Sequence, residues 1–312
     1  MITMELRLLT KEEFKNNIPQ LNNLFELAFK RSLQKDFLKW RYLDNPIDDL
    51  LVAVAIDCGK IVANYSASPV LVENENGVFK TALSMTTMTH PDYNGRGLFT
   101  SLANLLYEEM KKKEYKLVWG FPNLNSHGIF IKKLEWNDIY EIPNFALILS
   151  NIHKDSLESN ERIIEDNRFD IPLTFISNNN KYQVSKNQEY YKWRYLSNPI
   201  NNYIHLVFKE KDEIVGNIIY KEFKDEIDIL ELNGINSIVK RQLIFELISR
   251  SSEQKKINSW FNLHDDFHVE LEKIGFTNQI PITYMGAKDI NMENGSMNYS
   301  YWNIQMGDSD VY

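Results

Sequence analysis

The stretch Asn94-Gly95-Arg96-Gly97 stands between an apolar, β-rich run and a helical pattern that begins at Leu98. Free backbone N–H groups at a helix N-terminus, preceded by glycines that allow close approach, form a site for phosphate oxygens. The stretch therefore predicts a pyrophosphate site. It lacks the Lys-Ser or Lys-Thr of a Walker A motif, and the strands before it form a meander rather than a Rossmann unit, which disfavours nucleoside triphosphates and NAD.

Histidines provide the other candidate chemistry. His127 lies near the glycine stretch in sequence, and an imidazole can accept a proton near neutral pH, although a partly exposed histidine at a helix start is the simpler interpretation. His264 and His268 have the spacing of the zinc-binding His-Glu-x-x-His helix. Asp265 replaces the glutamate and no third ligand is evident, so we expect no metal.

The elements that must position this site follow from hydrophobic patterning. Apolar or β-branched runs bounded by turn residues predict strands, and apolar residues three or four apart predict helices. The first part of the chain then has a strand, a helix, a three-stranded meander, the glycine stretch with its helix, a strand, a second helix and a last strand. The predicted ranges are 5–9, 11–33, 50–56, 61–71, 79–88, 98–113, 116–120, a helix ending at 133, and 145–149.

One motif occurs twice in the same register. Lys-Trp-Arg-Tyr-Leu followed by Asn-Pro-Ile stands at 39–47 and again at 192–200. Strands predicted at 204–208, 214–220 and 227–232 repeat the meander and a helix at 239–250 follows, but the glycine stretch is missing. The chain is therefore predicted to hold two domain-sized copies, residues 1–150 and 151–312, of which only the first binds phosphate. Trp40 and Trp193 are predicted to anchor a helix to the sheet in each copy.

Composition limits the partners. The 312 residues are 43% hydrophobic, which suffices for real cores, and the net charge of −8 disfavours nucleic acid. The first residues carry charges where a signal peptide needs an apolar stretch, and the longest apolar run, 50–56, is too short to span a bilayer. We expect a cytoplasmic protein with neither a nucleic acid nor a membrane as partner. The sequence leaves the oligomeric state open.

The order of elements, and the segment THPDYNGRGLFTSLANLLYEEM at 89–110 in particular, resembles the GCN5-related N-acetyltransferase (GNAT) family. The resemblance implies an α/β (α+β) fold of two tandem GNAT-like domains, each with a mixed, mostly antiparallel sheet flanked by helices. It also implies acetyl-CoA as co-substrate. Gly97 matches the family's signature, whereas Asn94 and Phe99 stand where Gln or Arg and Gly or Ala are usual.

The resemblance also assigns contacts to the co-substrate. In the family, the strand before the loop faces the pantetheine arm, the loop N–H groups hold the pyrophosphate, and the start of the next helix contacts the CoA arm. For Asn123 and Ser126, helix capping is an interpretation of equal weight to contact with the CoA arm. The cofactor-binding residues implied here are Thr87, Met88, Thr89, Asn94, Gly95, Arg96, Gly97, Leu98, Phe99, Thr100, Asn123, Ser126 and Phe130.

Proton transfer is less well defined by the resemblance. The family often places a tyrosine on the second helix as general acid, and Ile131 stands at that position here. Some tandem acetyltransferases bring a chain terminus toward the acceptor amine. Asp308, Asp310 and the terminal carboxylate are candidates for that role, and His127 is the other catalytic candidate. The alternative for the last residues, which are predicted to begin as a strand at 301, is an exposed acidic tail.

These observations predict an acetyl-CoA-dependent N-acetyltransferase that acts on a primary amine of a small molecule. The acidic excess favours a cationic acceptor such as an amino sugar, an aminoglycoside or a polyamine. One alternative is a module that binds CoA without turnover. A second is an aminoacyl transferase of the tandem peptidoglycan-bridge type, which must hold tRNA and fits an acidic chain poorly.

Overall fold

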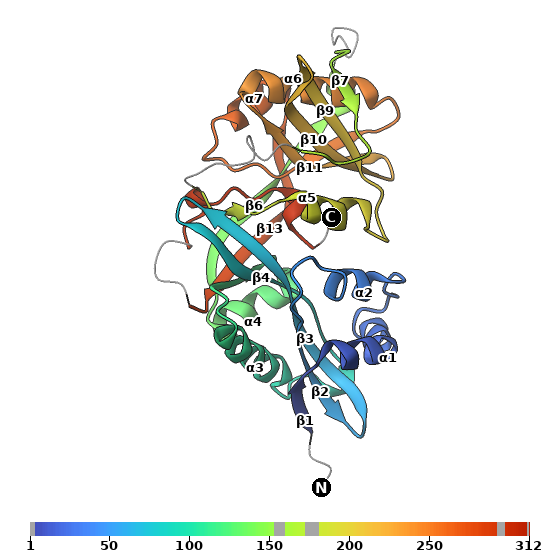
Figure 1. The fold of residues 1–312 in the computed structure, drawn as a ribbon, viewed down its shortest axis with the longest axis vertical. Coiled ribbons are helices and arrows are strands. Elements are labelled where there is room, and N and C mark those ends of the chain that lie inside the picture. The colour runs from blue at the N-terminus through green and yellow to red at the C-terminus, as the bar shows by residue number, and fades with distance from the viewer. Residues whose placement is uncertain (1–3, 153–159, 172–180, 292–296, 311) are drawn as a thin grey trace.

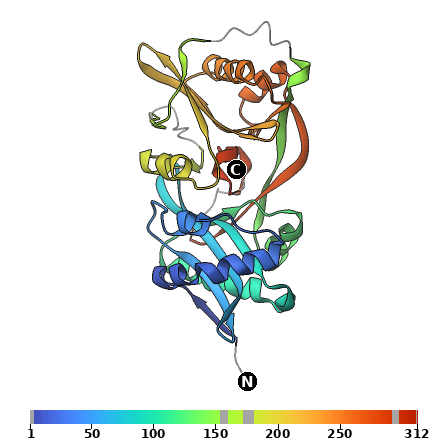
Figure 2. The same cartoon turned by 90° about the vertical axis from the view of Figure 1, so that its right-hand side faces the viewer.

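The computed structural model describes residues 4–152, 160–171, 181–291, 297–310 and 312. The molecule is elongated, with the N-terminal elements at one end and the later elements at the other (Figure 1). The last residue lies between these two halves, at the middle of the molecule (Figure 2). No helix of the described residues has the length and apolar character needed to cross a membrane.

The first half contains the predicted strand, helices and meander. Its strands are β1 (Glu5–Leu8), β2 (Leu51–Asp57), β3 (Lys60–Asn74), β4 (Gly77–Thr89), β5 (Leu117–Gly120) and β6 (Asn137–Ile148). Its helices are α1 (Lys11–Phe29), α2 (Phe37–Tyr42), α3 (Leu98–Lys112) and α4 (Leu124–Leu134). The last strand is longer than predicted, because β6 begins directly after α4 and continues into the second half.

Local signals explain where the two long helices of this half begin. The Thr10 hydroxyl accepts from the Glu13 N–H, and the Glu13 carboxylate accepts from the Thr10 N–H, which forms a capping box at the start of α1. α3 begins directly after Gly97 and buries one apolar stripe against the sheet. The buried residues of α3 are Leu98, Leu102, Ala103, Leu106, Tyr107 and Met110.

The second half repeats the order of meander, helix, strand, helix and strand. Its strands are β7 (Ile163–Glu165), β8 (Gln183–Val184), β9 (Ile204–Glu210), β10 (Glu213–Phe223), β11 (Glu226–Gly234), β12 (Lys256–Ser259) and β13 (Thr277–Asp289). Its helices are α5 (Gln188–Tyr191), which continues as a π-helical turn through Lys192–Leu196, α6 (Ser237–Arg250) and α7 (Phe267–Ile274).

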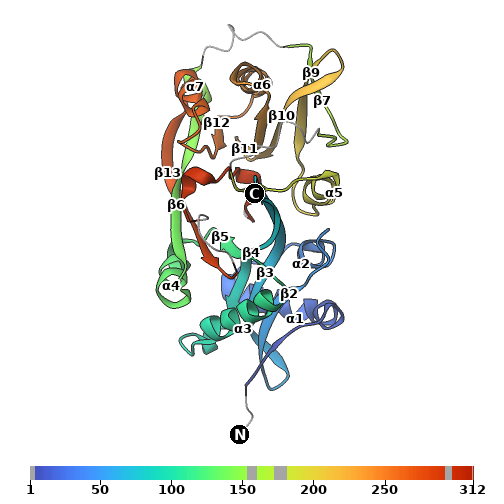
Figure 3. The same cartoon turned by 60° about the vertical axis from the view of Figure 1, so that its left-hand side comes forward.

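The strands of both halves form one sheet in the order β1-β2-β3-β4-β5-β13-β6-β12-β11-β10-β9-β7, with β8 on β3. The pairs β4–β5 and β11–β12 are parallel and the others are antiparallel. The predicted mixed, mostly antiparallel sheet with flanking helices is therefore confirmed. Two separate sheets were expected, however, and there is one, because the halves exchange their last strands: β13 pairs with β5 and β6 pairs with β12 (Figure 3).

The repeated motif joins the two halves. The Trp40 and Trp193 indoles stack with ring centroids 5.2 Å apart. Each indole N–H donates to the other tryptophan's carbonyl oxygen, at 2.9 Å from Trp40 and 3.0 Å from Trp193. This reciprocal contact has the form of a two-fold interface. The prediction that each tryptophan anchors a helix to its own sheet is thus wrong, because each anchors its segment to the other half.

Candidate active site

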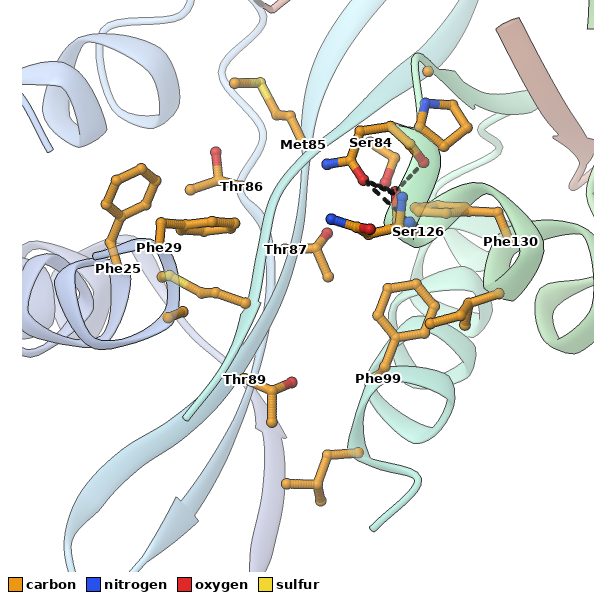
Figure 4. A pocket seen from close by; sticks show the side chains of 18 of the residues that line it. Phe25, Phe29, Ser84, Met85, Thr86, Thr87, Thr89, Phe99, Ser126 and Phe130 are labelled. Atoms are coloured by element: carbon orange, nitrogen blue, oxygen red, sulfur yellow. Dashed lines mark hydrogen bonds between the residues drawn. The ribbon is translucent and has the colours of Figure 1, made fainter. Parts of the chain in front are cut away.

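A cleft of about 1000 Å³ opens in the first half where β4 and β5 separate. These strands pair only at Thr81–Leu83, although β4 continues to Thr89. A Cβ on Gly120, at the point of separation, would lie 3.0 Å from the Ser84 carbonyl oxygen, so this position leaves little room for a side chain. Beyond this point β4 crosses the cleft with only β3 beside it in the described sheet. Figure 4 shows β4 with Phe25 and Phe29 on one side and Phe99 and Phe130 on the other.

β4 contains a bulge inside the cleft. Its pairing with β3 skips a position near Thr86, which has a φ of +54°, an uncommon conformation for a β-branched residue. The Asn64 side-chain amide donates to the Thr86 carbonyl oxygen at 2.8 Å, and the Tyr42 hydroxyl donates to the Thr86 hydroxyl at 3.0 Å. The Thr87 hydroxyl oxygen is buried with no hydrogen-bond partner. The cleft wall therefore offers polar groups that the described residues do not satisfy.

The glycine loop forms the entrance to α3. Gly95 and Gly97 have φ values of +77° and +75°, in the left-handed region that favours glycine. A Cβ built at either residue meets no protein atom within 4 Å, so both face open space. Among the described hydrogen bonds, none uses the backbone N–H groups of residues 95–100. These are the unpaired donors that the sequence predicted for a phosphate site.

The start of α4 closes the same side of the cleft. The Asn123 side-chain oxygen accepts from the N–H groups of Asn125 at 3.0 Å and Ser126 at 3.1 Å, so its capping role is confirmed. Both Asn123 and Ser126 also line the cleft, and their contact with CoA stays a prediction. Phe130 contacts Phe99 edge to face at 5.3 Å between ring centroids. All thirteen predicted cofactor-binding residues line this cleft.

The opposite wall comes from the end of α1 and the segment that follows, which sequence reasoning missed. Phe25, Phe29 and Phe37 line it together with Arg31. The Phe25 and Phe29 rings lie 4.6 Å apart, and the Arg31 guanidinium lies 5.7 Å from the Phe25 centroid. The only signal in the sequence is the four-residue spacing of two phenylalanines, which an ordinary core face shares.

Asp310 reaches this cleft from the other end of the chain. It is half-buried and lines the cleft beside residues of the first half. Burial raises the pKa of its carboxyl group, and the positive charge of Arg41 partly offsets that rise. Arg41 is itself buried, with its guanidinium 5.2 Å from the Trp193 ring centroid. The structure thus brings one of the two predicted catalytic candidates into the cleft.

The segment around Asp308 is folded into the protein. The Asp308 carboxylate lies 2.8 Å from the Lys186 amino group, which also lies 3.0 Å from the Glu231 carboxylate, and all three are buried. Residues 306–308 form a 3₁₀ turn. The predictions of a strand from 301 and of an exposed acidic tail are therefore wrong, because this segment has apolar side chains to bury. Those buried are Trp302, Ile304 and Met306.

His127 lies outside the set of cleft residues. Its Nε2 atom is 2.6 Å from the Asp138 carboxylate, and its ring stacks on Tyr284 of β13 at 4.0 Å. This position gives no support to a catalytic role for His127. The zinc-like pair does not share a helix, since α7 begins at Phe267, after His264. Among the described residues no three His, Cys, Asp or Glu side chains form a metal-binding group.

The second half has the same strand separation, but its own chain fills the space. β11 pairs with β12 only at Glu226–Asp228. Beyond that point the Gln305 side-chain oxygen accepts from the Leu232 N–H at 2.7 Å. A Cβ on Gly307 would lie 2.5 Å from the Tyr195 hydroxyl oxygen, so the segment fits tightly. The chain itself therefore occupies the space that corresponds to the cleft, and the binding of CoA by the first half alone stays a prediction.

Comparison with known proteins places the first half in a family. Residues 5–138 match the acetyltransferase (GNAT) domain family. The first half of the chain is thus similar to GNAT domains, a family whose co-substrate is an acyl-CoA. No curated protein sequence matches the chain.

Solved structures resemble the chain over nearly its whole length. A probable N-acyltransferase from Enterococcus faecalis has a TM-score of 0.73 at 14% identity, covering 93% of this chain and 73% of its own. A GCN5-related N-acetyltransferase from Anabaena variabilis has a TM-score of 0.68 at 14% identity, with the same coverage of 93% and 73%. Eis1 from Mycobacterium abscessus has a TM-score of 0.60 at 11% identity, covering 93% and 74%. At these identities the likeness establishes the fold of both halves.

Proposed function

We propose that the chain is an acetyl-CoA-dependent N-acetyltransferase that acts on a primary amine of a small molecule. The observation that carries this proposal is a single cleft crossed by β4 and lined by the glycine loop, the aromatic wall and Asp310. Phe99 and Phe130 lie on one side of β4, and Phe25 and Phe29 lie on the other. Asp310 belongs with Phe25 and Phe29, because its carboxyl group interacts with Arg41 of α2, the helix that follows α1. We call the Phe99 side of β4 the donor side and the Phe29 side the acceptor side. Residues 1–150 would hold CoA. Residues 151–312 would shape the acceptor side, since Ile200 and Asp310 come from that part of the chain.

The donor side fits acetyl-CoA. Free N–H groups at the start of α3 match pyrophosphate oxygens, and the cations Arg96 and Lys133 line the same side. The unpaired Thr87 hydroxyl and the open stretch of β4 match a pantetheine arm, which carries amides that pair with a strand. Phe99 and Phe130 would pack against its apolar carbons.

The reaction forms one C–N bond and breaks one C–S bond. The neutral amine attacks the thioester carbonyl carbon, the nitrogen loses a proton, and the sulfur leaves and takes up a proton. Main-chain N–H groups of β4 beyond its pairing with β5 would stabilise the carbonyl oxygen. Asp310 would accept the proton from the amine. Placement of the two reactants can itself lower a barrier by about 7–11 kcal/mol, so little further assistance is needed.

A CoA-binding module without turnover is the second candidate. Ile131 stands where the family often has its tyrosine, and its side chain packs against the core beside α3 and α4. No general acid is therefore supplied from that position. In the enzyme, the leaving sulfur would take its proton from solvent.

Calorimetric titration with acetyl-CoA tests the proposal. We expect one site per chain, and no binding at millimolar acetyl-CoA would refute both candidate functions. Release of CoA in the presence of an amine then separates the candidates. Release with any amine in a broad panel supports the enzyme, and binding without release across that panel supports the module.

A further inference from the structure

The acceptor side of the cleft indicates which class of amine the enzyme takes, an inference that rests on the proposed function. Its apolar surface comes from Phe25, Phe29 and Phe37, with Met85 on the β4 side. Phe29 leaves 40% of its surface exposed, although its ring contacts that of Phe25 at 4.6 Å between centroids. An exposed phenylalanine inside a cleft offers apolar area that a ligand can cover.

The charges of the cleft differ from those of the whole chain. Although the protein carries a net charge of −8, the described cleft lining has three cationic side chains and one carboxylate. Arg96 and Lys133 are on the donor side. The acceptor side is left with Arg31 and Asp310. The acidic excess that favoured a polycationic acceptor is therefore located elsewhere on the protein.

These charges disfavour an acceptor with more than one positive charge. In the proposed reaction Asp310 faces the reacting nitrogen, so a second ammonium group would find no other carboxylate among the described residues that line the cleft. It would also lie in the field of Arg31. Aromatic rings can attract a cation, but the Arg31 guanidinium already stands 5.7 Å from the Phe25 centroid.

We propose that the acceptor is a primary monoamine with an apolar or aromatic body, bound against Phe25, Phe29 and Phe37, rather than a polyamine or an aminoglycoside. The amine nitrogen lies toward Asp310 and β4, and the body covers the aromatic wall. Burial of a phenyl-sized group is worth a factor of about 10 to 100 in kcat/KM when the wall fits it.

The test compares amines of matched length. Hexylamine and 1,5-diaminopentane differ only in whether the far end is a methyl or an ammonium group, and phenethylamine adds a ring. In a CoA-release assay we expect kcat/KM for both monoamines to exceed that of the diamine at least about tenfold, after correction for its two reactive ends. An equal or higher value for the diamine, or a preference for spermidine or kanamycin, would overturn the inference.

Variants make the test specific to the wall. Phe29→Ala should lower kcat/KM for phenethylamine about tenfold and leave the Kd of acetyl-CoA unchanged, because Phe29 lies across β4 from Phe99 and Phe130. Phe223→Ala is the matched control, since Phe223 is 59% exposed in the second half. Arg31→Glu should raise kcat/KM for the diamine relative to hexylamine. If Phe29→Ala and Phe223→Ala behave alike, the wall does not bind the acceptor.

Acetyl-CoA titration distinguishes failure of the proposed function from failure of the inference about the acceptor. If acetyl-CoA does not bind, the proposed function fails and this inference fails with it. If it binds and kanamycin or spermidine is acetylated while both monoamines are not, the proposed function stands and the inference is wrong. If it binds and no amine is acetylated, calorimetry with hexylamine in the presence of CoA decides, and absence of binding there also refutes the inference.

Discussion

Replacement of Gly97 by aspartate tests the donor side most directly. Gly97 directly precedes α3 at a φ of +75°, and a Cβ there faces open space. A carboxylate about 5 Å from a pyrophosphate charge, at an effective dielectric constant of about 20, costs about 3 kcal/mol. That corresponds to an affinity loss of roughly 100-fold. An aspartate in the left-handed backbone conformation costs about 1 kcal/mol of stability. A negative charge at the helix start regains part of that cost, so the free energy of unfolding of Gly97→Asp should differ little from that of wild type.

Calorimetric titration of acetyl-CoA into Gly97→Asp, Gly97→Ala and Asn236→Asp measures this effect. Gly97→Ala has the same backbone strain without the charge, and its affinity should lie between those of wild type and Gly97→Asp. Asn236 caps α6 by accepting from the Val239 N–H at 3.0 Å, and an aspartate keeps that bond. Asn236→Asp should therefore leave the affinity within about twofold. Equal losses from the Gly97 and Asn236 variants, or two sites per chain, would refute the assignment of CoA to the first half.

Three further predictions concern the junction and the second half. Trp193→Ala should lower the free energy of unfolding by about 3–5 kcal/mol in urea titrations, and a Trp40→Ala/Trp193→Ala double variant should lose less than the sum of the single losses. Asp310→Asn should lower kcat about 100-fold and leave the Kd of acetyl-CoA unchanged. It should also remove the acid limb of the kcat–pH profile. In wild type this limb should lie above the usual carboxyl range, because burial raises the pKa of Asp310. Burial lowers the pKa of His205 in the folded protein, whereas in the unfolded chain the pKa is about 6.5. The contribution of this histidine to the free energy of unfolding is therefore full above about pH 6.5 and is lost as the pH falls through the folded-state pKa. Urea unfolding of His205→Gln should show a shallower loss of stability between about pH 7 and about pH 5 than wild type, and an equal loss would refute this role.

The sequence predicted the donor side well and the acceptor side poorly, for a physical reason. A phosphate site at a helix start depends on backbone and glycine, so residues 94–100 identify it within one short segment. The acceptor side combines Phe29, Ile200 and Asp310, which are far apart in the chain and carry no local signal. The order of elements followed from patterning, but strand exchange did not, because the apolar pattern of β13 is the same whichever strand it pairs with.

The exchange of last strands also sets an order of events during synthesis. Gly120 of β5 pairs with Gly286 of β13, so the first half leaves the ribosome long before β13, the strand that completes its sheet, is synthesised. Until then β5 presents an open edge to other nascent chains. Contacts between such distant segments slow folding, since a long loop must close before they form. Residues 1–150 made alone would keep that edge permanently, whereas the two halves made as separate chains would each supply the strand that the other lacks.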